Sequence, residues 1–357
     1  MDKSIIIFYA IPVFFLLIVI EFIYGLIVKN NTYRMNDTFV SISIGLISRI
    51  PVILNLGFSA FVFALAATTF NLKLMPVDSW ITWVVAFLMY DLIYYTQHRL
   101  HHEIKILWAT HVVHHHGEEF NMSTAMRQTS TGWLWKWMFY TPMMVIGIPA
   151  EVFITVGGIN LVYQYWVHTE HVPKLGWLEK IFITPSNHRV HHAKNPEYID
   201  ANYGGVFIIW DRLFSTYQEE KEDEKCIYGI RSAIKTFDPV KANIHIYQKI
   251  FKDLSYSFSL KNFYSVITAR TGWSPEGPSE DNFDPNVFEK HDPSIKPLTK
   301  FYAFTQFLCM SYAAVVLFAD KNMEYDQGVM LICIVIFSMF CTAKWLDAEK
   351  IIKLEYL

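Results

Sequence analysis

Long apolar runs separated by short polar stretches occupy much of the chain. Six of them contain at most two charged residues each, and they lie at 4–28, 38–70, 79–97, 133–167, 301–318 and 328–343. A helix of about 20 apolar residues crosses the hydrocarbon core of a bilayer. The pattern therefore predicts an all-α, multi-pass transmembrane protein.

Local signals refine this pattern. The run 4–28 is too long for a secretory signal and lacks a small-residue cleavage site before Lys29, so we expect a retained membrane helix. Arg49 and Pro51 predict a kinked or partly re-entrant path through 38–70. Gly147-Ile148-Pro149 divides 133–167 into two short helices that form a membrane hairpin, and the last two runs are expected to form a closing hairpin.

Basic residues predict how the chain is oriented, because Lys and Arg accumulate on the cytoplasmic side of membrane helices. They follow the first run, the third run and the hairpin, as Lys29, Arg34, Arg99, Lys105, Arg127, Lys174, Lys180, Arg189 and Lys194. We therefore expect one cytoplasmic face, in a bacterial inner membrane or the endoplasmic reticulum. The expected parts are N-terminal transmembrane helices (1–97), a histidine-rich region with the hairpin (98–232), a cytoplasmic segment (233–299) and a C-terminal hairpin with its tail (300–357).

Composition agrees with a membrane protein and excludes several other classes. Of 357 residues, 53% are hydrophobic and 18% charged, whereas soluble domains carry about a quarter charged residues. A net charge of −3 argues against nucleic acid as a partner. The four cysteines show no C-x-x-C spacing, which argues against a disulfide framework, a zinc ribbon or an iron–sulfur cluster.

Histidines form the main chemical signal. Twelve of the fourteen lie between residues 98 and 192, in the stretches HRLHH (98–102), HVVHH (111–115) and HRVHH (188–192) and nearby. Residues three and four apart share one face of a helix, so each stretch can direct two or three imidazoles to one point. Eight imidazoles can supply four ligands to each of two metals, and the candidates are His98, His102, His111, His114, His115, His188, His191 and His192.

Histidines outside these eight are expected to differ in role. His168 ends an apolar run on the same face as His98 does, so we expect it to be a ninth ligand; His171 is left open, and His101 and His116 are expected to be structural. Imidazole binds iron, zinc, copper and nickel alike, so the ligand type does not choose the metal. Structural zinc sites take four ligands and often thiolates, so eight or more nitrogen donors beside a lipid face favour a redox-active pair. The metal site is expected where the first stretch ends a membrane helix, in a helical cap on the cytoplasmic face.

The three boxes together resemble the membrane-bound fatty acid hydroxylase and sterol desaturase superfamily. The longer strings YYTQHRLHHEIKILWATHVVHH (94–115), NMSTAMRQ (121–128), WVHTE (166–170) and TPSNHRVHHAKNPEYIDANYGGVFIIWDRLFSTY (184–217) are similar to its ether-lipid-cleaving branch, the alkylglycerol monooxygenases. The resemblance implies a di-iron monooxygenase with its catalytic region at 98–232 and the eight box histidines as ligands. It also implies a role for Glu103, which follows the first box, in orienting a histidine or delivering protons.

The branch further implies a substrate and a reductant. The substrate would be a membrane alkylglycerol, oxidised by dioxygen at the ether α-carbon to a hemiacetal that collapses to a fatty aldehyde and glycerol. The chain has no flavin, haem or iron–sulfur signature, so electrons must come from outside, from a reduced pterin (tetrahydrobiopterin) or a small electron-transfer protein.

Two alternatives stay open. The first is a sterol or fatty-acid hydroxylase or desaturase with the same di-iron core. The second is a membrane metal transporter or sensor, which predicts exchangeable metal and polar residues that line a path through the spans.

Overall fold

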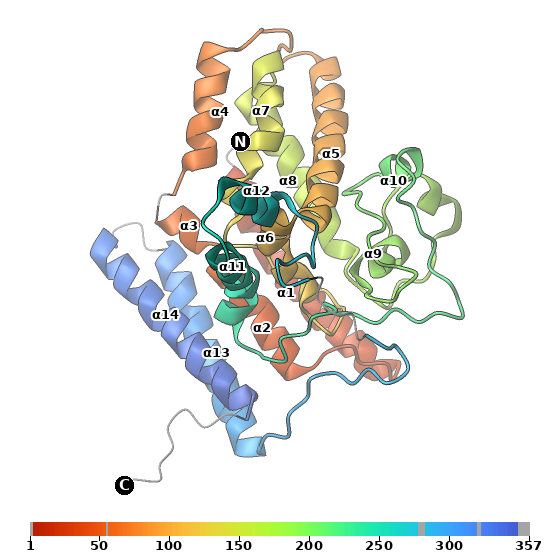
Figure 1. The fold of residues 1–357 in the computed structure, drawn as a ribbon, viewed down its shortest axis with the longest axis vertical. Helices are drawn as coiled ribbons and strands as arrows, with labels where there is room; N and C mark the ends of the chain where they lie inside the picture. Colours follow the sequence, from red (N-terminus) through yellow and green to blue (C-terminus); the bar gives the residue numbers. More distant parts are fainter. Residues whose placement is uncertain (1–2, 55, 278–282, 320–322, 349–357) are drawn as a thin grey trace.

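The computed structural model describes residues 3–54, 56–277, 283–319 and 323–348, and these form an all-α fold (Figure 1). Among them no β-strand forms, only isolated bridges such as that between Ile104 and Arg270. The prediction of an all-α membrane protein is confirmed. The helices are α1 (Lys3–Ile27), α2 (Met35–Ile47), α3 (Ile50–Ile53), α4 (Phe58–Thr69), α5 (Trp80–Glu103), α6 (Lys105–His115), η1 (Thr124–Met126), η2 (Gly132–Leu134), α7 (Lys136–Ile146), α8 (Ala150–Trp166), η3 (Gly176–Lys180), α9 (Pro185–His192), α10 (Ile209–Leu213), α11 (Pro239–Ser255), α12 (Leu260–Thr268), α13 (Pro297–Ala319) and α14 (Tyr325–Leu346).

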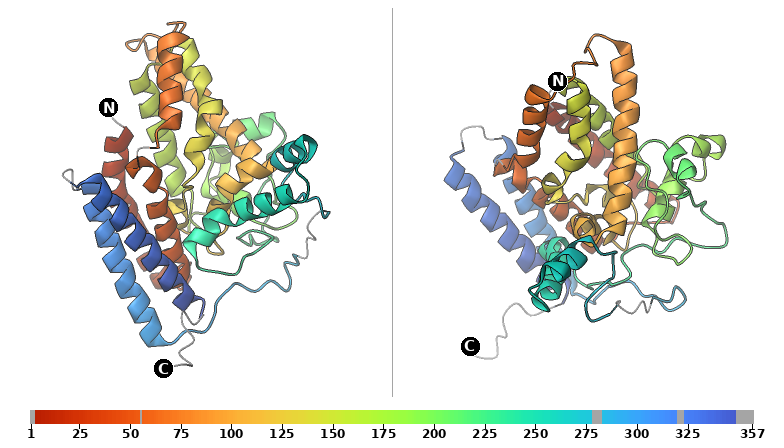
Figure 2. Two further views of the ribbon diagram at one scale, coloured as in Figure 1. Left: turned by 60° about the vertical axis from the view of Figure 1, so that its left-hand side comes forward. Right: turned by 45° about the horizontal axis from the view of Figure 1, so that its top comes forward.

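Three of the described helices are long and apolar enough to cross a membrane. Their spanning segments are Ala10–Ile27, Pro297–Leu317 and Tyr325–Leu346. The last two belong to α13 and α14, which pack against each other as the predicted closing hairpin, and α14 also packs against α2 (Figure 2). The chain is therefore an integral membrane protein.

The run 38–70 is broken as its Arg49 and Pro51 predicted. Its first part belongs to α2, which ends at Ile47, and its last part is α4, with the single turn α3 between them. Buried side chains of α2 such as Phe39 and Ile44 pack with residues of α13 and α14 in one apolar cluster. The α4 helix instead packs against α7, so the two parts of this run pack against different helices.

The predicted bend at Gly147-Ile148-Pro149 is also present, between α7 and α8. Gly147 ends α7 with φ 99°, a left-handed conformation that glycine adopts without steric cost. A Cβ there would lie 2.8 Å from Asn71 Oδ1, so the close approach of the loop before α5 also needs glycine. α7 and α8 are 11 and 17 residues long, shorter than a full span.

The first two histidine boxes lie on consecutive helices. α5 ends at Glu103, and the next residue, Ile104, is extended (φ −108°, ψ 124°) before α6 begins. Lys105 fixes this corner: its backbone N–H donates to Ala269 O (2.9 Å), and its buried ammonium pairs with Asp253 and donates to Trp273 O (2.8 Å). The corner thus turns α6 back against α5, with α11 and the loop after α12 as its support.

A buried carboxylate ties α5 to the loop that follows the third box. Asp91, on α5, is 0% exposed and accepts four hydrogen bonds. The donors are Asn160 Nδ2 of α8 (2.7 Å), Val206 N (2.8 Å), Phe207 N (3.1 Å) and Trp210 Nε1 (2.9 Å). A buried carboxylate must find donors to offset its lost hydration, so these bonds fix the relative position of the three segments.

We expect Asp91→Asn to destabilise the fold, because the amide brings an N–H group toward atoms that donate to the carboxylate. The loss is about 2 kcal/mol of unfolding free energy, typical for hydrogen bonds to a charged buried group. Thermal unfolding of the detergent-solubilised protein measures it as a lower apparent Tm. Asp78→Asn is the matched control, because Asp78 is exposed in the loop before α5; equal Tm values for the two variants would contradict the role of Asp91.

Candidate metal centre

Nine histidines converge in the structure into two adjoining groups, and they are the nine that the sequence predicted. A five-histidine group contains His98, His102, His111, His115 and His191. A four-histidine group contains His114, His168, His188 and His192. In each group, one ring nitrogen per residue lies within 4.8 Å of those of all the others.

Helix geometry explains how each H-x-x-H-H box serves both groups. Successive residues on an α-helix are rotated by about 100°, so the neighbouring histidines at the fourth and fifth positions of a box point in different directions. On α6, His111 and His115 enter the five-histidine group and His114 the other. On α9 the assignment is reversed, with His188 and His192 in the four-histidine group and His191 in the five-histidine group.

The remaining three histidines complete the two groups from α5 and from the segment after α8. His98 and His102, four residues apart on α5, both join the five-histidine group. His168 lies two residues after the end of α8 and provides the fourth member of the other group. The residues that meet here come from four segments of the chain, which lie around the centre of the molecule in Figure 1.

Backbone carbonyls hold four of these rings in one tautomer. The ring Nδ1 atom lies within hydrogen-bond distance of a carbonyl in His98 (Tyr203 O, 2.8 Å), His114 (Arg127 O, 3.0 Å), His168 (Gln164 O, 2.8 Å) and His191 (Ala201 O, 2.9 Å). A carbonyl oxygen only accepts, so Nδ1 carries the proton in each neutral ring. The Nε2 atom is then left with a free lone pair, the form in which a histidine binds a metal.

Those Nε2 lone pairs face one another, and their distances indicate whether the residues can bind a cation. The Nε2 atoms of His114 and His168 lie 3.3 Å apart, and neither carries a proton to share. The Nε2 atoms of His168 and His188 are 3.0 Å apart, and those of His98 and His111 are 2.9 Å apart. The Nε2 atoms of His102 and His191 have no hydrogen-bond partner among the described residues. A positive ion in each group would satisfy these atoms together, so the donor set fits a metal.

Burial lowers the pKa values of eight of these imidazoles and so favours their neutral form. Seven of the nine side chains are at most 7% exposed. Burial lowers the pKa of His114 to about 4, and burial together with neighbouring imidazoles holds the pKa values of His188, His191 and His192 well below their usual value. Neutral nitrogen donors in a buried site are what metal binding requires.

The segment after the third box positions two of these carbonyls, those of Ala201 and Tyr203. Asp200 and Asn202 adopt φ values of 60° and 57°, a conformation uncommon outside glycine. Asp211 accepts from Tyr203 N (2.7 Å) and Gly204 N (2.8 Å), so the carbonyl of Tyr203 is fixed against His98. Asp200 itself lies 3.7 Å from His102 Nδ1. The sequence does not reveal these acceptors, because a backbone carbonyl has no side-chain signal.

Four other residues that the sequence analysis singled out lie outside the two histidine groups. The carboxylate of Glu103 is paired with Arg99 at 2.8 Å, and its side chain is 36% exposed; no described contact joins it to a histidine of either group, so its role stays a prediction. His101 stacks against His111 from outside the groups, and His116 Nδ1 lies 2.9 Å from Arg127 Nη2. His171, which the sequence left open, packs against Tyr24 and belongs to neither group.

Comparison with known proteins agrees with this centre. Residues 83–216 match the fatty acid hydroxylase family. The chain is 37% identical over 347 residues to alkylglycerol monooxygenase of Homo sapiens, with 95% of this chain and 77% of the relative covered. It is 36% identical over 329 residues to alkylglycerol monooxygenase of Danio rerio (90% and 73% covered) and 30% identical over 141 residues to the ornithine lipid hydroxylase OlsE of Rhizobium tropici (39% and 43% covered).

No solved structure shows significant similarity to the chain. The relatives at 36–37% identity extend over most of both sequences, well beyond the matched hydroxylase region. The chain therefore belongs to the alkylglycerol monooxygenase family, a membrane-bound branch of the fatty acid hydroxylases.

Proposed function

We propose that this protein is a di-iron monooxygenase that hydroxylates the ether α-carbon of membrane alkylglycerols. The observation that carries the proposal is the pair of adjoining histidine groups, whose unprotonated Nε2 atoms face one another in a buried site. The names of the relatives, alkylglycerol monooxygenases, support the substrate.

Iron is the metal that the family resemblance favours, and the number of nitrogen donors agrees with a redox-active pair. The five-histidine group would hold one ion and the four-histidine group the other, and bound iron supplies the redox chemistry that activates dioxygen. The contribution of the chain is to orient the imidazoles through the carbonyls of Gln164, Arg127, Ala201 and Tyr203 and to keep bulk water from a site with little exposure.

The overall reaction balances with a two-electron donor. One oxygen atom of dioxygen enters the C–H bond beside the ether oxygen, and the other leaves as water with two electrons and two protons from the reductant. The hydroxylated carbon is a hemiacetal, so its C–O bond breaks to give a fatty aldehyde and glycerol. We propose a reduced pterin as the donor, with a small electron-transfer protein as the alternative.

The spans and the basic residues support a proposal for the location. A lipid substrate reaches the site from the bilayer, in which α1, α13 and α14 are long enough to lie. We propose that the metal centre lies on the cytoplasmic face, at the inner membrane of a bacterium or at the endoplasmic reticulum. Lys29, Lys174 and Lys180, which flank membrane helices or the histidine region, support this orientation.

A turnover assay tests the substrate and the reductant together. We expect an alkylglycerol with dioxygen and tetrahydrobiopterin to give a fatty aldehyde, detected as its hydrazone by mass spectrometry, because hydroxylation at the ether carbon releases it. A sterol and a free fatty acid, supplied to the same preparation, are the matched controls. Turnover of these lipids with cytochrome b5 or ferredoxin, and none with the pterin, would show that the alternative hydroxylase function is correct.

Metal analysis with histidine variants tests the centre. We expect two tightly held irons per chain in the purified protein and a loss of about one iron, with all turnover, in His114→Ala, because the four-histidine group then has three members. His171→Ala is the control and should keep both metals. Membrane insertion should be unchanged in both, since neither residue lies in a spanning segment. Readily exchangeable zinc in place of iron would instead indicate a transporter or sensor.

A further inference from the structure

The pair of helices α11 and α12, which pack against each other as a hairpin, carries an exposed apolar band around its turn. The most exposed members are Phe258 and Leu260, at 98% and 89%. The band consists of large apolar side chains between residues 251 and 264, namely Phe251, Tyr256, Phe258, Leu260, Phe263 and Tyr264. Exposed apolar surface of this kind marks a site that contacts a partner or a membrane.

The α12 helix is apolar on two faces, and its fold uses only one of them. Val266 is 0% exposed and packs in one apolar cluster with Ile250 of α11 and a residue of α6. Leu260, Phe263 and Tyr264 recur at a spacing of three and four residues, so they share another face of the helix. All three are exposed, so this second apolar face contacts no other part of the described chain closely enough to be covered.

The charged residues of the same segment are almost all basic. Asp253 is the only acidic residue between positions 239 and 275. It is 1% exposed and its carboxylate pairs with Lys105, so it adds no negative charge to the surface. The basic residues of this segment are Lys241, Lys249, Lys252, Lys261 and Arg270. The band therefore lies on a segment whose exposed charge is positive, which is complementary to the anionic lipid headgroups of a membrane.

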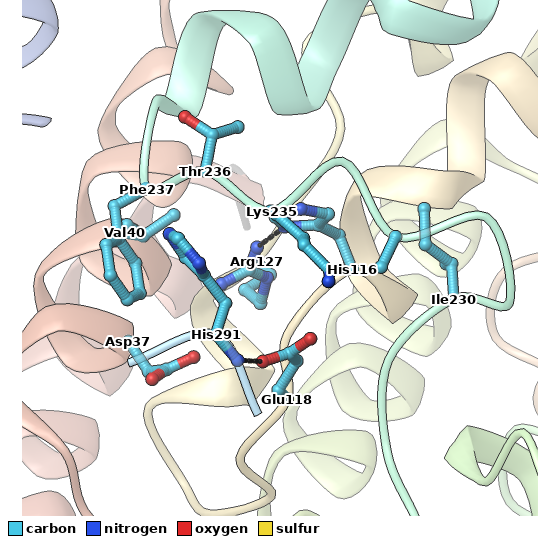
Figure 3. Close-up of a pocket in the computed structure, with 11 residues that line it drawn as sticks. Asp37, Val40, His116, Glu118, Arg127, Ile230, Lys235, Thr236, Phe237 and His291 are labelled. Atoms are coloured by element: carbon cyan, nitrogen blue, oxygen red, sulfur yellow. Dashed lines mark hydrogen bonds between the residues drawn. The ribbon is translucent and has the colours of Figure 1, made fainter. Parts of the chain in front are cut away.

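The base of the α11–α12 hairpin is fixed to the end of a membrane span. α11 packs against α14, and Asp347, which follows α14, accepts from Phe237 N (2.8 Å) just before α11 begins. Asp347 also lies 3.1 Å from His291 Nε2, and the rings of Phe237 and His291 lie next to each other with centroids 5.0 Å apart (Figure 3). From this point α11 runs away from α14 toward α12 (Figure 2). The hairpin therefore extends sideways from the end of a span.

Length and composition favour a helix that lies in the plane of the membrane. α12 has nine residues, too few to cross a bilayer, and neither α11 nor α12 is a candidate span. A helix with exposed apolar side chains next to Lys and Arg is typical of the boundary between headgroups and acyl chains. Tyr side chains are enriched at this depth, because an apolar ring carries a polar hydroxyl, and the band contains Tyr256 and Tyr264.

From these observations we infer that the apolar band of the α11–α12 hairpin inserts into the headgroup boundary of the membrane, with Lys249, Lys252 and Lys261 close to anionic lipids. The partner of the exposed face is thus the surface of the same membrane that α14 spans. Part of the segment 233–299, which the sequence predicted to be cytoplasmic, is then a second membrane contact. Because α11 and α12 both pack against α6, the helix of the second histidine box, this contact holds the metal centre at the membrane surface.

Site-specific photocrosslinking tests the contact. The full-length protein is prepared with p-benzoylphenylalanine in place of Phe258, in nanodiscs of phosphatidylcholine and phosphatidylglycerol, and lipid adducts are measured by mass spectrometry after irradiation. Phe337, 68% exposed within the α14 span, is the positive control; Val287, 72% exposed between Asp284 and Glu289, is the matched control outside the hairpin. We expect an adduct yield at Phe258 close to that at Phe337 and at least about tenfold above that at Val287, because a side chain at the acyl boundary meets lipid in place of water.

Crosslinks to a second copy of the chain, or no adduct at position 258 while position 337 gives lipid adducts, would overturn the inference. Because Phe258 is almost fully exposed, its replacement should leave Tm unchanged, and a lower Tm would identify a folding defect. A second probe is then p-benzoylphenylalanine in place of Leu260. Neither measurement involves turnover, so the outcome is independent of the proposed reaction.

Hydrogen–deuterium exchange tests the role of charge. Protection of the backbone amides of α12 should increase with the fraction of phosphatidylglycerol in the nanodisc, and the increase should be lost in the double variant Lys249→Gln/Lys261→Gln. Lys221→Gln is the control, because Lys221 is an exposed lysine that pairs with Glu197 outside the hairpin. Exchange of α12 that does not change between nanodiscs with and without the anionic lipid would show that the lysines do not contact its headgroups.

Discussion

The structure depends on a set of imidazole lone pairs that are buried and directed at one another. The Nδ1 protons of His98, His114, His168 and His191 are fixed on backbone carbonyls, so the opposite nitrogens have no proton to share. Without a cation, such an arrangement is repulsive and its atoms stay unsatisfied. Metal binding at these groups would therefore stabilise the folded protein, as is general for sites whose ligands are brought together by folding.

The sequence predicted much of this centre because helical periodicity places the histidines. Spacing of three and four residues selected the eight box histidines, and position at the end of an apolar run selected His168. The apolar runs also predicted the breaks near Arg49 and at Gly147. The sequence did not predict which histidines of a box join which group, because this depends on how α6 and α9 face the two groups in three dimensions.

The parts that the sequence could not predict are those built from the backbone and from distant contacts. The carbonyls of Tyr203 and Ala201 become acceptors only because Asp200 and Asn202 adopt left-handed conformations and Asp211 holds the loop. The buried pairing of Lys105 with Asp253 joins residues far apart in the sequence, and periodicity carries no information about such pairs. Lys105 was read from the sequence as a marker of the cytoplasmic face, but its burial at 2% shows a structural role.

Arg127 shows how the metal centre is connected to the helices around it. Its backbone carbonyl orients His114, and its guanidinium donates to Val113 O and Ser41 Oγ and lies beside His116 Nδ1. Asp347, which follows the last membrane helix, accepts from Phe237 N and lies 3.1 Å from His291 Nε2. Movement of the C-terminal hairpin would therefore shift Phe237 and His291, and a shift of Arg127 would reach His114 through one hydrogen bond. Segments from both ends of the chain, α2 and the hairpin, thus take part in positioning the centre, although all nine of its histidines lie between residues 98 and 192.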